Sequence, residues 1–217
     1  MNKNKIIYVP MGADIIHAGH LNIIKKAKKY GKIVIGLFTD SAIAEYKTLP
    51  LINYNQRLEI MKNIKGISKI MKQDTWDYSI NLNKLKPNYV IHGDDWKKGI
   101  QQKTRQKVIK LIKKWKGQLI EVPYTKKINI KENKKNINNI FYNPETRVSR
   151  LNRLIGSKKI VRFIESHNPL TGLMIENLKI NHNNEYKEFD GIWSSSLTDS
   201  ASNGKPDNQS LELSSRI

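Results

Sequence analysis

The sequence contains no cysteine among its 217 residues. This absence excludes a disulfide framework, a thiolate nucleophile and a zinc site built on cysteine. Long apolar runs are missing too, since no stretch reaches the roughly 18–20 residues of a membrane span. The charged first five residues precede an apolar run at residues 6–9 that is too short for a signal-peptide core. We therefore expect a soluble, cytoplasmic protein with no membrane span.

Acidic residues are scarce, with 19 Asp and Glu against 39 Lys and Arg, which gives a net charge of +20. Such a charge favours anionic partners, namely nucleotides, phosphates, nucleic acid or an anionic surface. Aromatic residues make up only 8% of the chain, and no recognition-helix, RRM or KH pattern is present. The lysines are spread along several predicted helices, as on solvated faces, and abundant Lys, Asn and Ile also fit a compositional bias. We expect a small anionic ligand and no nucleic-acid partner.

The first 125 residues alternate between short apolar runs and amphipathic stretches. Short apolar runs indicate buried strands, and apolar residues spaced three or four apart indicate helices. The predicted strands cover residues 6–9, 32–39, 67–71, 89–92 and 118–122, and the predicted helices cover residues 18–30, 55–64 and 104–115. This alternation predicts an α/β fold with a parallel sheet, whose ligand lies beyond the carboxyl ends of the strands.

The composition changes after the last of these strands. Residues 126–143 are polar, rich in Lys and Asn and without a clear period, which is typical of a linker. A second β-α-β pattern follows, with helices expected at residues 146–155 and 170–178 and strands at 160–164 and 189–193. We therefore predict three parts, a domain at 1–125, a linker at 126–143 and a second unit at 144–217.

A pair of histidines lies where the first strand leads into a helix, in the run His17-Ala18-Gly19-His20. A helix N-terminus offers free N–H groups and a partial positive charge to an anion. Residues three apart share one helix face, and Gly19 leaves room for a phosphate. Two imidazoles at this place can stabilise charge that develops on a phosphate under attack. The alternative is a pair of helix-start histidines with capping or surface roles.

Three motifs together carry a family resemblance, the segment at residues 9–24, the Gly93-Asp94-Asp95-Trp96 motif after a strand, and Arg57 in a helix that opens at Tyr54. Over roughly residues 5–125 the sequence resembles the HxGH nucleotidyltransferases, in particular the branch that includes glycerol-3-phosphate cytidylyltransferase. The resemblance implies a Rossmann-like fold and attack of a phosphate or phosphonate oxygen on the α-phosphorus of CTP. It also implies Mg²⁺ held largely by the substrate phosphates, with no dedicated protein cage, and a possible homodimer.

The resemblance assigns roles to individual residues. The expected catalytic residues are His17, His20, Lys47 and Arg57, with Lys47 and Arg57 acting on the triphosphate or the acceptor. The expected nucleotide-binding residues are Met11, Gly12, Asp14, Gly19, Gly93, Asp94, Asp95, Trp96 and Thr125. Without the resemblance, the alternative interpretation of Lys47 is a solvated lysine, and that of Arg57 is a surface residue of its helix. An ATP-using adenylyltransferase would share the histidine motif, and residues 93–96 are the reason to prefer CTP.

One departure concerns a hydroxyl-bearing segment that the family carries after its last strand. Here the corresponding positions hold Asn129 and Ile130. The loss of a charge-assisted hydrogen bond costs about 1.5–3 kcal/mol, so phosphate binding or turnover should suffer. The alternative to an active enzyme is therefore a nucleotide-binding remnant without activity.

The second unit carries its own resemblance, in residues 159–168 and 188–201. These stretches resemble the opening of the phosphoenolpyruvate mutases, although alone they read as strands with a serine-rich loop. The resemblance assigns a substrate-cradling loop and the start of a gating segment to Trp193, Ser195, Ser196, Leu197 and Asp207. A (β/α)₈ barrel needs about 200 residues, so we expect an incomplete barrel without mutase activity. The fusion suggests a phosphonate acceptor such as 2-aminoethylphosphonate.

Overall fold

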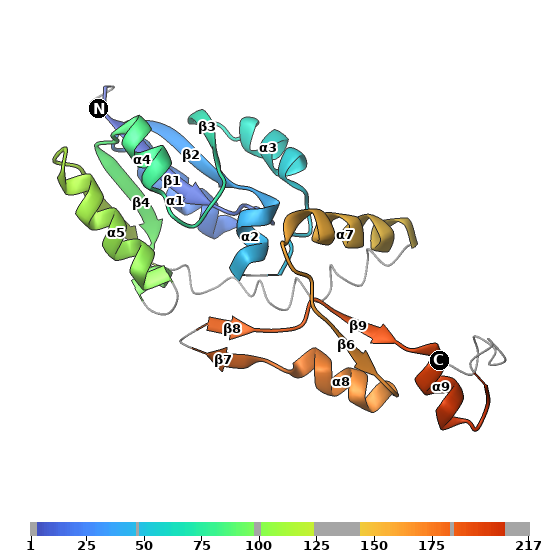
Figure 1. Cartoon of the computed structure of the whole chain (residues 1–217). Helices are drawn as coiled ribbons and strands as arrows, with labels where there is room; N and C mark the ends of the chain where they lie inside the picture. The colour runs from blue at the N-terminus through green and yellow to red at the C-terminus, as the bar shows by residue number, and fades with distance from the viewer. Residues whose placement is uncertain (1–3, 47, 98–100, 124–143, 183–184, 207–217) are drawn as a thin grey trace. The chain divides into compact units, whose positions relative to one another are not determined.

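The computed structural model describes residues 4–46, 48–97, 101–123, 144–182 and 185–206. The chain forms two compact units, Met1–Lys159 and Ile160–Ile217. Helix α7 (Pro144–Ser157) belongs to the first unit because it packs against α2 (Asp40–Tyr46) (Figure 1). The contact boundary thus lies after Lys159, whereas the sequence places the start of the second unit at residue 144. The three-part division with a linker at 126–143 stays a prediction.

Among the described residues of the first unit, five strands form one parallel sheet. They are β1 (Ile6–Met11), β2 (Lys32–Phe38), β3 (Ile67–Gln73), β4 (Tyr89–Gly93) and β5 (Gln118–Val122). Their order is β3-β2-β1-β4-β5, so β1 is central and the chain changes direction across the sheet beside it (Figure 1). The predicted α/β fold with a parallel sheet is confirmed, and the order of its strands is that of a Rossmann-like fold.

Helices α1 (Ala18–Lys28), α2, α3 (Tyr54–Lys62), α4 (Ser79–Leu85) and α5 (Gln101–Lys113) cover the two faces of this sheet. The described residues also form a short 3₁₀ helix, η1 (Asp94–Lys97), and α7 packs against α2. Alternation along β1 explains the two layers. Ile7 and Val9 pack in one cluster with residues of α1 and α3, whereas Tyr8 packs in the other with residues of α2, α4 and α5. Two cores, one on each face, therefore fix the sheet.

A buried polar network crosses the second of these cores. The hydroxyl of Tyr8 is hydrogen-bonded to Gln73 Oε1 and accepts from Asn81 Nδ2 at 3.2 Å. Burial raises the pKa of Tyr8 well above its usual range. Gly36 on β2 lies beside this ring, and a Cβ at that position would overlap the Tyr8 hydroxyl. The sheet therefore needs a glycine there for close packing.

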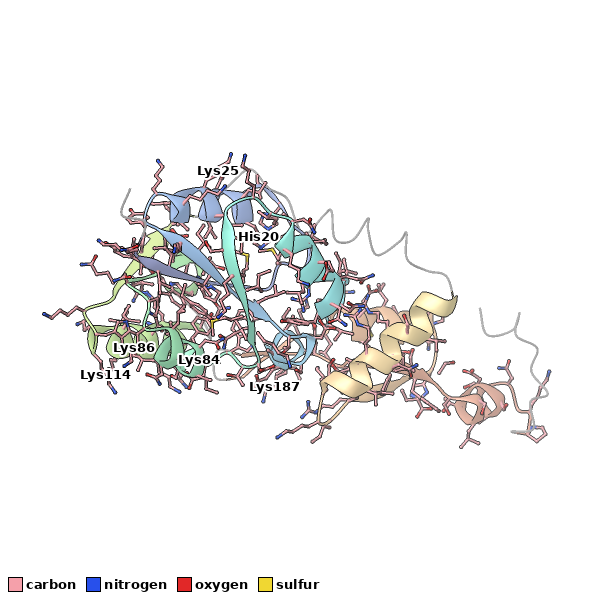
Figure 2. The ribbon with its side chains drawn as sticks, turned by 90° about the horizontal axis from the view of Figure 1, so that it is seen from above. His20, Lys25, Lys84, Lys86, Lys114 and Lys187 are labelled. Atoms are coloured by element: carbon pink, nitrogen blue, oxygen red, sulfur yellow. The ribbon has the colours of Figure 1, made fainter. Side chains whose placement is uncertain are left out.

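The outer surface of the first unit carries much of the positive charge. Figure 2 shows Lys25 on α1, Lys84 and Lys86 near the end of α4, and Lys114 after α5, all pointing away from the interior. All four side chains are exposed. Solvent-exposed lysines of this kind are typical of solvated helix surfaces.

The described residues of the second unit form two small sheets. Strands β6 (Phe163–Ser166) and β9 (Gly191–Ser194) pair in parallel, and β7 (Ile180–His182) pairs antiparallel with β8 (Glu185–Lys187). Helices α8 (Pro169–Asn177) and α9 (Ser196–Ser202) follow β6 and β9. The strand predicted at 160–164 begins three residues later. One parallel pair is compatible with the start of a barrel, and the incomplete barrel stays a prediction.

Candidate nucleotide site

A cavity of about 360 Å³ opens at the carboxyl ends of the strands of the first unit. This is the place expected for the ligand of a parallel sheet, at the change of direction between β1 and β4. Its lining residues are Pro10, Met11, Gly12, Ala13, Asp14, Ile15, His17, Gly19, His20, Ile23, Phe38, Ile43, Thr48, Trp76, His92, Gly93, Asp95, Gln101, Val122 and Pro123. Of the sequence-predicted nucleotide residues, Met11, Gly12, Asp14, Gly19, Gly93 and Asp95 lie in this lining.

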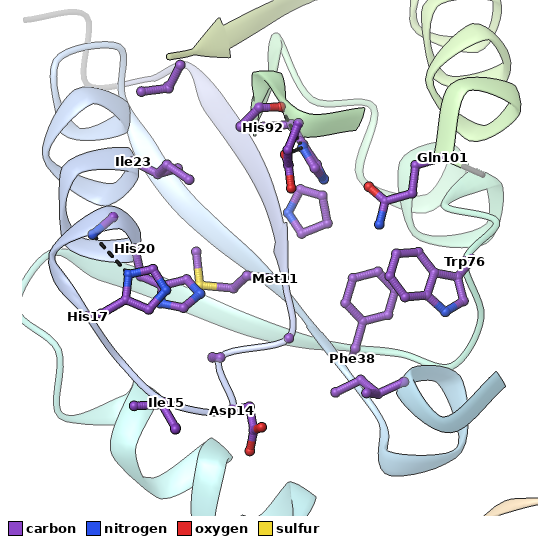
Figure 3. A pocket seen from close by; sticks show the side chains of 18 of the residues that line it. Met11, Asp14, Ile15, His17, His20, Ile23, Phe38, Trp76, His92 and Gln101 are labelled. Atoms are coloured by element: carbon purple, nitrogen blue, oxygen red, sulfur yellow. Dashed lines mark hydrogen bonds and ion pairs between the residues drawn. The ribbon is translucent and has the colours of Figure 1, made fainter. Parts of the chain in front are cut away.

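The two predicted histidines lie side by side at one end of the cavity (Figure 3). Their ring centroids are 3.9 Å apart, and the rings are inclined by 40°. His17 is the N-cap of α1, and its Nδ1 accepts a hydrogen bond from the Gly19 N–H at 3.1 Å. Burial lowers the pKa of His17, so its ring is neutral at pH 7. Because Nδ1 accepts, the proton of the neutral ring is on Nε2, which can donate to a phosphate oxygen.

The loop between β1 and α1 passes under the histidines. Ala13 in this loop has φ of +53°, in the left-handed region that disfavours side chains, and is almost fully buried. Asp14 Oδ1 accepts from the backbone N–H groups of Leu51 at 2.8 Å and Ile52 at 3.2 Å. Asp14 therefore joins this loop to the segment before α3, and the ordering role expected for it stays a prediction.

Arg57 does not reach the cavity, contrary to the expected role on the triphosphate or the acceptor. Its side chain is fully buried. The guanidinium donates to the carbonyls of Gly12, Phe38 and Ile52 at 2.5, 2.8 and 3.1 Å, and it pairs with Asp40 at 2.7 Å. A buried guanidinium surrounded by acceptors is a structural clamp, which here fixes the ends of β1 and β2.

The motif at residues 93–96 divides between the cavity and the core. Gly93 and Asp95 line the cavity, whereas Asp94 is not part of the lining. Trp96 is fully buried below it, where its ring stacks on His92 with 3.9 Å between centroids and 5° between planes. Trp96 therefore supports the cavity wall from below and is not part of the lining. The resemblance had implied that Trp96 lines the cytidine side of the site. His92 is a lining residue that sequence reasoning missed, although it directly precedes the motif at the end of β4.

Glu121 on β5 holds this wall together. Its carboxylate accepts from Trp96 Nε1 at 2.8 Å and from Arg105 Nε and Nη2 at 2.8 and 3.2 Å, and it lies 3.3 Å from Lys97 Nζ. These partners, Arg105 first, lower the pKa of Glu121 to about 2. One carboxylate thus ties η1 and α5 to the edge of the sheet, and with them the cavity residue Asp95.

An aromatic wall closes the cavity on the β2–β3 side. Phe38 at the end of β2 and Trp76 after β3 have ring centroids 4.7 Å apart (Figure 3). The indole N–H of Trp76 donates to the Ala42 carbonyl at 2.5 Å, which fixes the ring against α2. The same figure shows Gln101 at the start of α5, on the side of the cavity away from His17. The sequence did not predict these three residues, because they come from three separate parts of the chain, the end of β2, the segment after β3 and the start of α5.

Several predicted site residues lie outside the described part of the chain, namely Lys47, Thr125, Asp207 and the departing pair Asn129 and Ile130. In the second unit, Ser195 caps α9 by accepting from the Thr198 N–H at 3.4 Å, and Ser196 opens that helix. Trp193 and Leu197 are exposed, at 62% and 61%. The mutase-like role of these residues stays a prediction.

The cavity offers few ligands for a metal ion. Within the described residues, no group of three or more His, Cys, Asp or Glu side chains is placed to hold one. The cavity carboxylates are Asp14, engaged with two backbone N–H groups, and Asp95. This donor set fits a Mg²⁺ ion that arrives on the phosphates of a nucleotide and keeps most of its other ligands as water.

No helix in the described part of the chain is both long and apolar enough to span a bilayer.

Comparison with known proteins gives a match to the cytidylyltransferase-like family over residues 13–170. An FAD synthase of Methanothermus fervidus is 35% identical over 101 residues, which cover 45% of this chain and 68% of that protein. An FAD synthase of Methanopyrus kandleri is 28% identical over 38% of this chain and 57% of that protein. The ethanolamine-phosphate cytidylyltransferase of Dictyostelium discoideum is 30% identical over 50% of this chain, but only 31% of that protein is covered.

Proposed function

This chain belongs to the cytidylyltransferase-like family, and on that premise we propose that it transfers CMP from CTP to a small phosphonate or phosphorylated alcohol, with release of pyrophosphate. The observation that carries the proposal is the pair His17 and His20, whose ring centroids are 3.9 Å apart. The pair lies at the N-terminus of α1 and lines the cavity. The Nε2–H of His17 and the positive end of the α1 dipole together favour a polyphosphate at this place.

The reaction needs no covalent intermediate on the protein. An acceptor oxygen forms a bond to the α-phosphorus, and the bond from that phosphorus to the oxygen bridging to the β-phosphate breaks. His17 Nε2 donates to the phosphate oxygens, which gain charge as the acceptor approaches. A divalent ion bound with the triphosphate supplies further charge neutralisation. The buried clamp of Arg57 holds the Gly12 carbonyl, which keeps the loop under the phosphates in place.

Two donors are compatible with this chemistry. The motif around Gly93 and Asp95 supports CTP through its resemblance to the cytidylyltransferases, and the Dictyostelium relative supports it by name. The second candidate is adenylyl transfer from ATP, which is favoured by the 35% identity to an enzyme that makes an adenine-containing product, FAD. The two readings differ only in the base, so the same cavity and the same histidines serve both.

We propose the acceptor from the fusion of the first unit to the second. Within residues 159–201 the second unit resembles the opening of the phosphoenolpyruvate mutases, which make a carbon–phosphorus bond. 2-Aminoethylphosphonate differs from phosphoethanolamine by the absence of one bridging oxygen. The Dictyostelium relative bears the name of an enzyme for that phosphate ester. An aminoethyl group on a phosphorus acid is therefore the acceptor class to test first.

The test is pyrophosphate release by the full chain with Mg²⁺, either CTP or ATP, and a panel of acceptors. The panel contains 2-aminoethylphosphonate, phosphoethanolamine, glycerol 3-phosphate, phosphocholine and FMN. We expect release with CTP and an aminoethyl acceptor, and its loss in His17→Ala. Release with ATP and FMN would establish the second candidate instead. Nucleotide binding without release under any condition would identify a remnant impaired by the change at Asn129 and Ile130.

A further inference from the structure

Helix α7 contacts the segment that leads from α2 to α3 (Figure 1). Arg153 of α7 donates through Nη1 to the Leu51 carbonyl at 3.2 Å, and through Nη2 to the Pro50 carbonyl at 3.0 Å. The same Nη2 lies 3.0 Å from Asp40 Oδ2. One guanidinium therefore holds two consecutive backbone carbonyls and a carboxylate.

The segment held in this way borders the cavity. Thr48 lines the cavity, and the N–H groups of Leu51 and Ile52 donate to Asp14, another lining residue. Leu51 is thus held on both sides, through its N–H by Asp14 and through its carbonyl by Arg153. The position of Asp14, and with it the loop that leads to His17, depends on where this segment lies.

Asp40 shares its two oxygens between two arginines. Oδ1 pairs with Arg57 at 2.7 Å and Oδ2 with Arg153 at 3.0 Å, and the carboxylate is 17% exposed. Arg57 in turn donates to the Ile52 and Gly12 carbonyls. A planar guanidinium can serve several acceptors at once, whereas the single ammonium of a lysine cannot reproduce that geometry.

We propose that Arg153 is a positioning residue of the nucleotide site. It fixes residues 50 and 51 from the outside, as Asp14 fixes residues 51 and 52 from the cavity side. Helix α7 is thereby a working part of the nucleotidyltransferase, although the sequence assigns it to the second unit. The link to nucleotide affinity rests on the proposed function, but the link to the order of residues 50–52 does not.

The test uses the full chain with Arg153→Ala, Arg153→Lys and the control Arg150→Ala. Arg150 is an exposed arginine three residues earlier on the same helix. Hydrogen exchange of the Leu51 and Ile52 amides, measured without nucleotide, should accelerate about tenfold or more in Arg153→Ala. In Arg153→Ala the Kd for CTP, measured by titration calorimetry, should rise about tenfold. The Kd of Arg153→Lys should lie between those of the unmodified chain and Arg153→Ala. Arg150→Ala should stay within about twofold of the unmodified chain.

Unchanged exchange at Leu51 and Ile52 in Arg153→Ala would overturn the proposal, whatever the activity of the chain. The same holds if Arg153→Ala and Arg150→Ala weaken CTP binding equally. If the unmodified chain neither binds CTP nor releases pyrophosphate, the proposed function fails, while accelerated exchange would still establish the positioning role. Should Arg153→Ala fail to fold, as judged by circular dichroism, Arg153→Lys is compared with Arg150→Ala for the same amides.

Discussion

Replacement of Glu121 by Gln tests whether charge holds the wall that carries Asp95 and His92. Glutamine keeps the size of the side chain and one acceptor oxygen, so the Trp96 N–H can still be satisfied. It removes the negative charge and turns donors toward Arg105 and Lys97. The variant therefore separates the effect of the charge from the effect of packing.

The magnitude follows from the pKa of Glu121, which falls from 4.5 to about 2 in the folded chain. A shift of that size corresponds to about 3 kcal/mol of stabilisation. Arg105 and Lys97 are 28% and 50% exposed, so solvent screens part of it, and we expect a loss of about 2 kcal/mol at pH 7. Because the folded pKa is lowered, this stabilisation is complete above the unfolded pKa of 4.5 and disappears as the pH falls toward 2.

The assay is urea unfolding followed by tryptophan fluorescence, at pH values from 7 down to 3. The stability gap between the unmodified chain and Glu121→Gln should be largest at pH 7 and less than half as large at pH 3. The control is Glu59→Gln, in which an exposed ion pair with Lys62 is removed, with an expected loss of at most about 0.5 kcal/mol. Equal losses in the two variants, or a gap that does not depend on pH, would refute the reasoning.

Three further predictions concern single positions. His17→Asn keeps an N-cap acceptor and should preserve the thermal midpoint, whereas His17→Ala should lose about 1 kcal/mol, and both should abolish pyrophosphate release. Gly36→Ala should lower the free energy of unfolding by about 3 kcal/mol, because the new Cβ overlaps the Tyr8 hydroxyl. Gly156→Ala places a Cβ that meets no neighbour, so in a thermal melt it should stabilise the chain by at most about 1 kcal/mol. Trp96→Phe should keep the stacking on His92 and lose about 1 kcal/mol in urea unfolding, against about 3–5 kcal/mol for Trp96→Ala; equal losses would show that stacking contributes nothing.

The strands and long helices could be predicted because their signals are local. Each buried strand is a short apolar run, and α1, α3, α5 and α7 are long enough to show helical spacing. Helices α2 and α4 have seven residues each, which is too short for a repeated apolar pattern, and both were missed. The sequence also could not show that α7 packs on the first unit, because its contacts with α2 and the hydrogen bonds of Arg153 reach residues about a hundred positions earlier.

The site divides in the same way. His17, Gly19 and the loop at Met11 and Gly12 were predicted because one continuous motif carries them. The direction of Arg57 depends on carbonyls from three separate segments, so its burial could not be predicted from the helix that bears it. Phe38, Trp76 and His92 come together only because parallel strands end at one edge, and no local pattern marks them as neighbours.

The central place of β1 bears on how such a protein can diversify. One group of lining residues lies at or directly after the end of β1, namely Met11, Gly12, Asp14, His17 and His20. His92, Gly93 and Asp95 instead belong to the half of the sheet formed by β4 and β5. That half is supported by Glu121, which bonds with Trp96, Lys97 and Arg105, whereas Asp40 on the other side pairs with Arg57 and Arg153. Substitutions can therefore accumulate in the half formed by β4 and β5 while the loop and helix that follow β1 stay constant. The lining residues of one half can thus change without a change in the support of the other half.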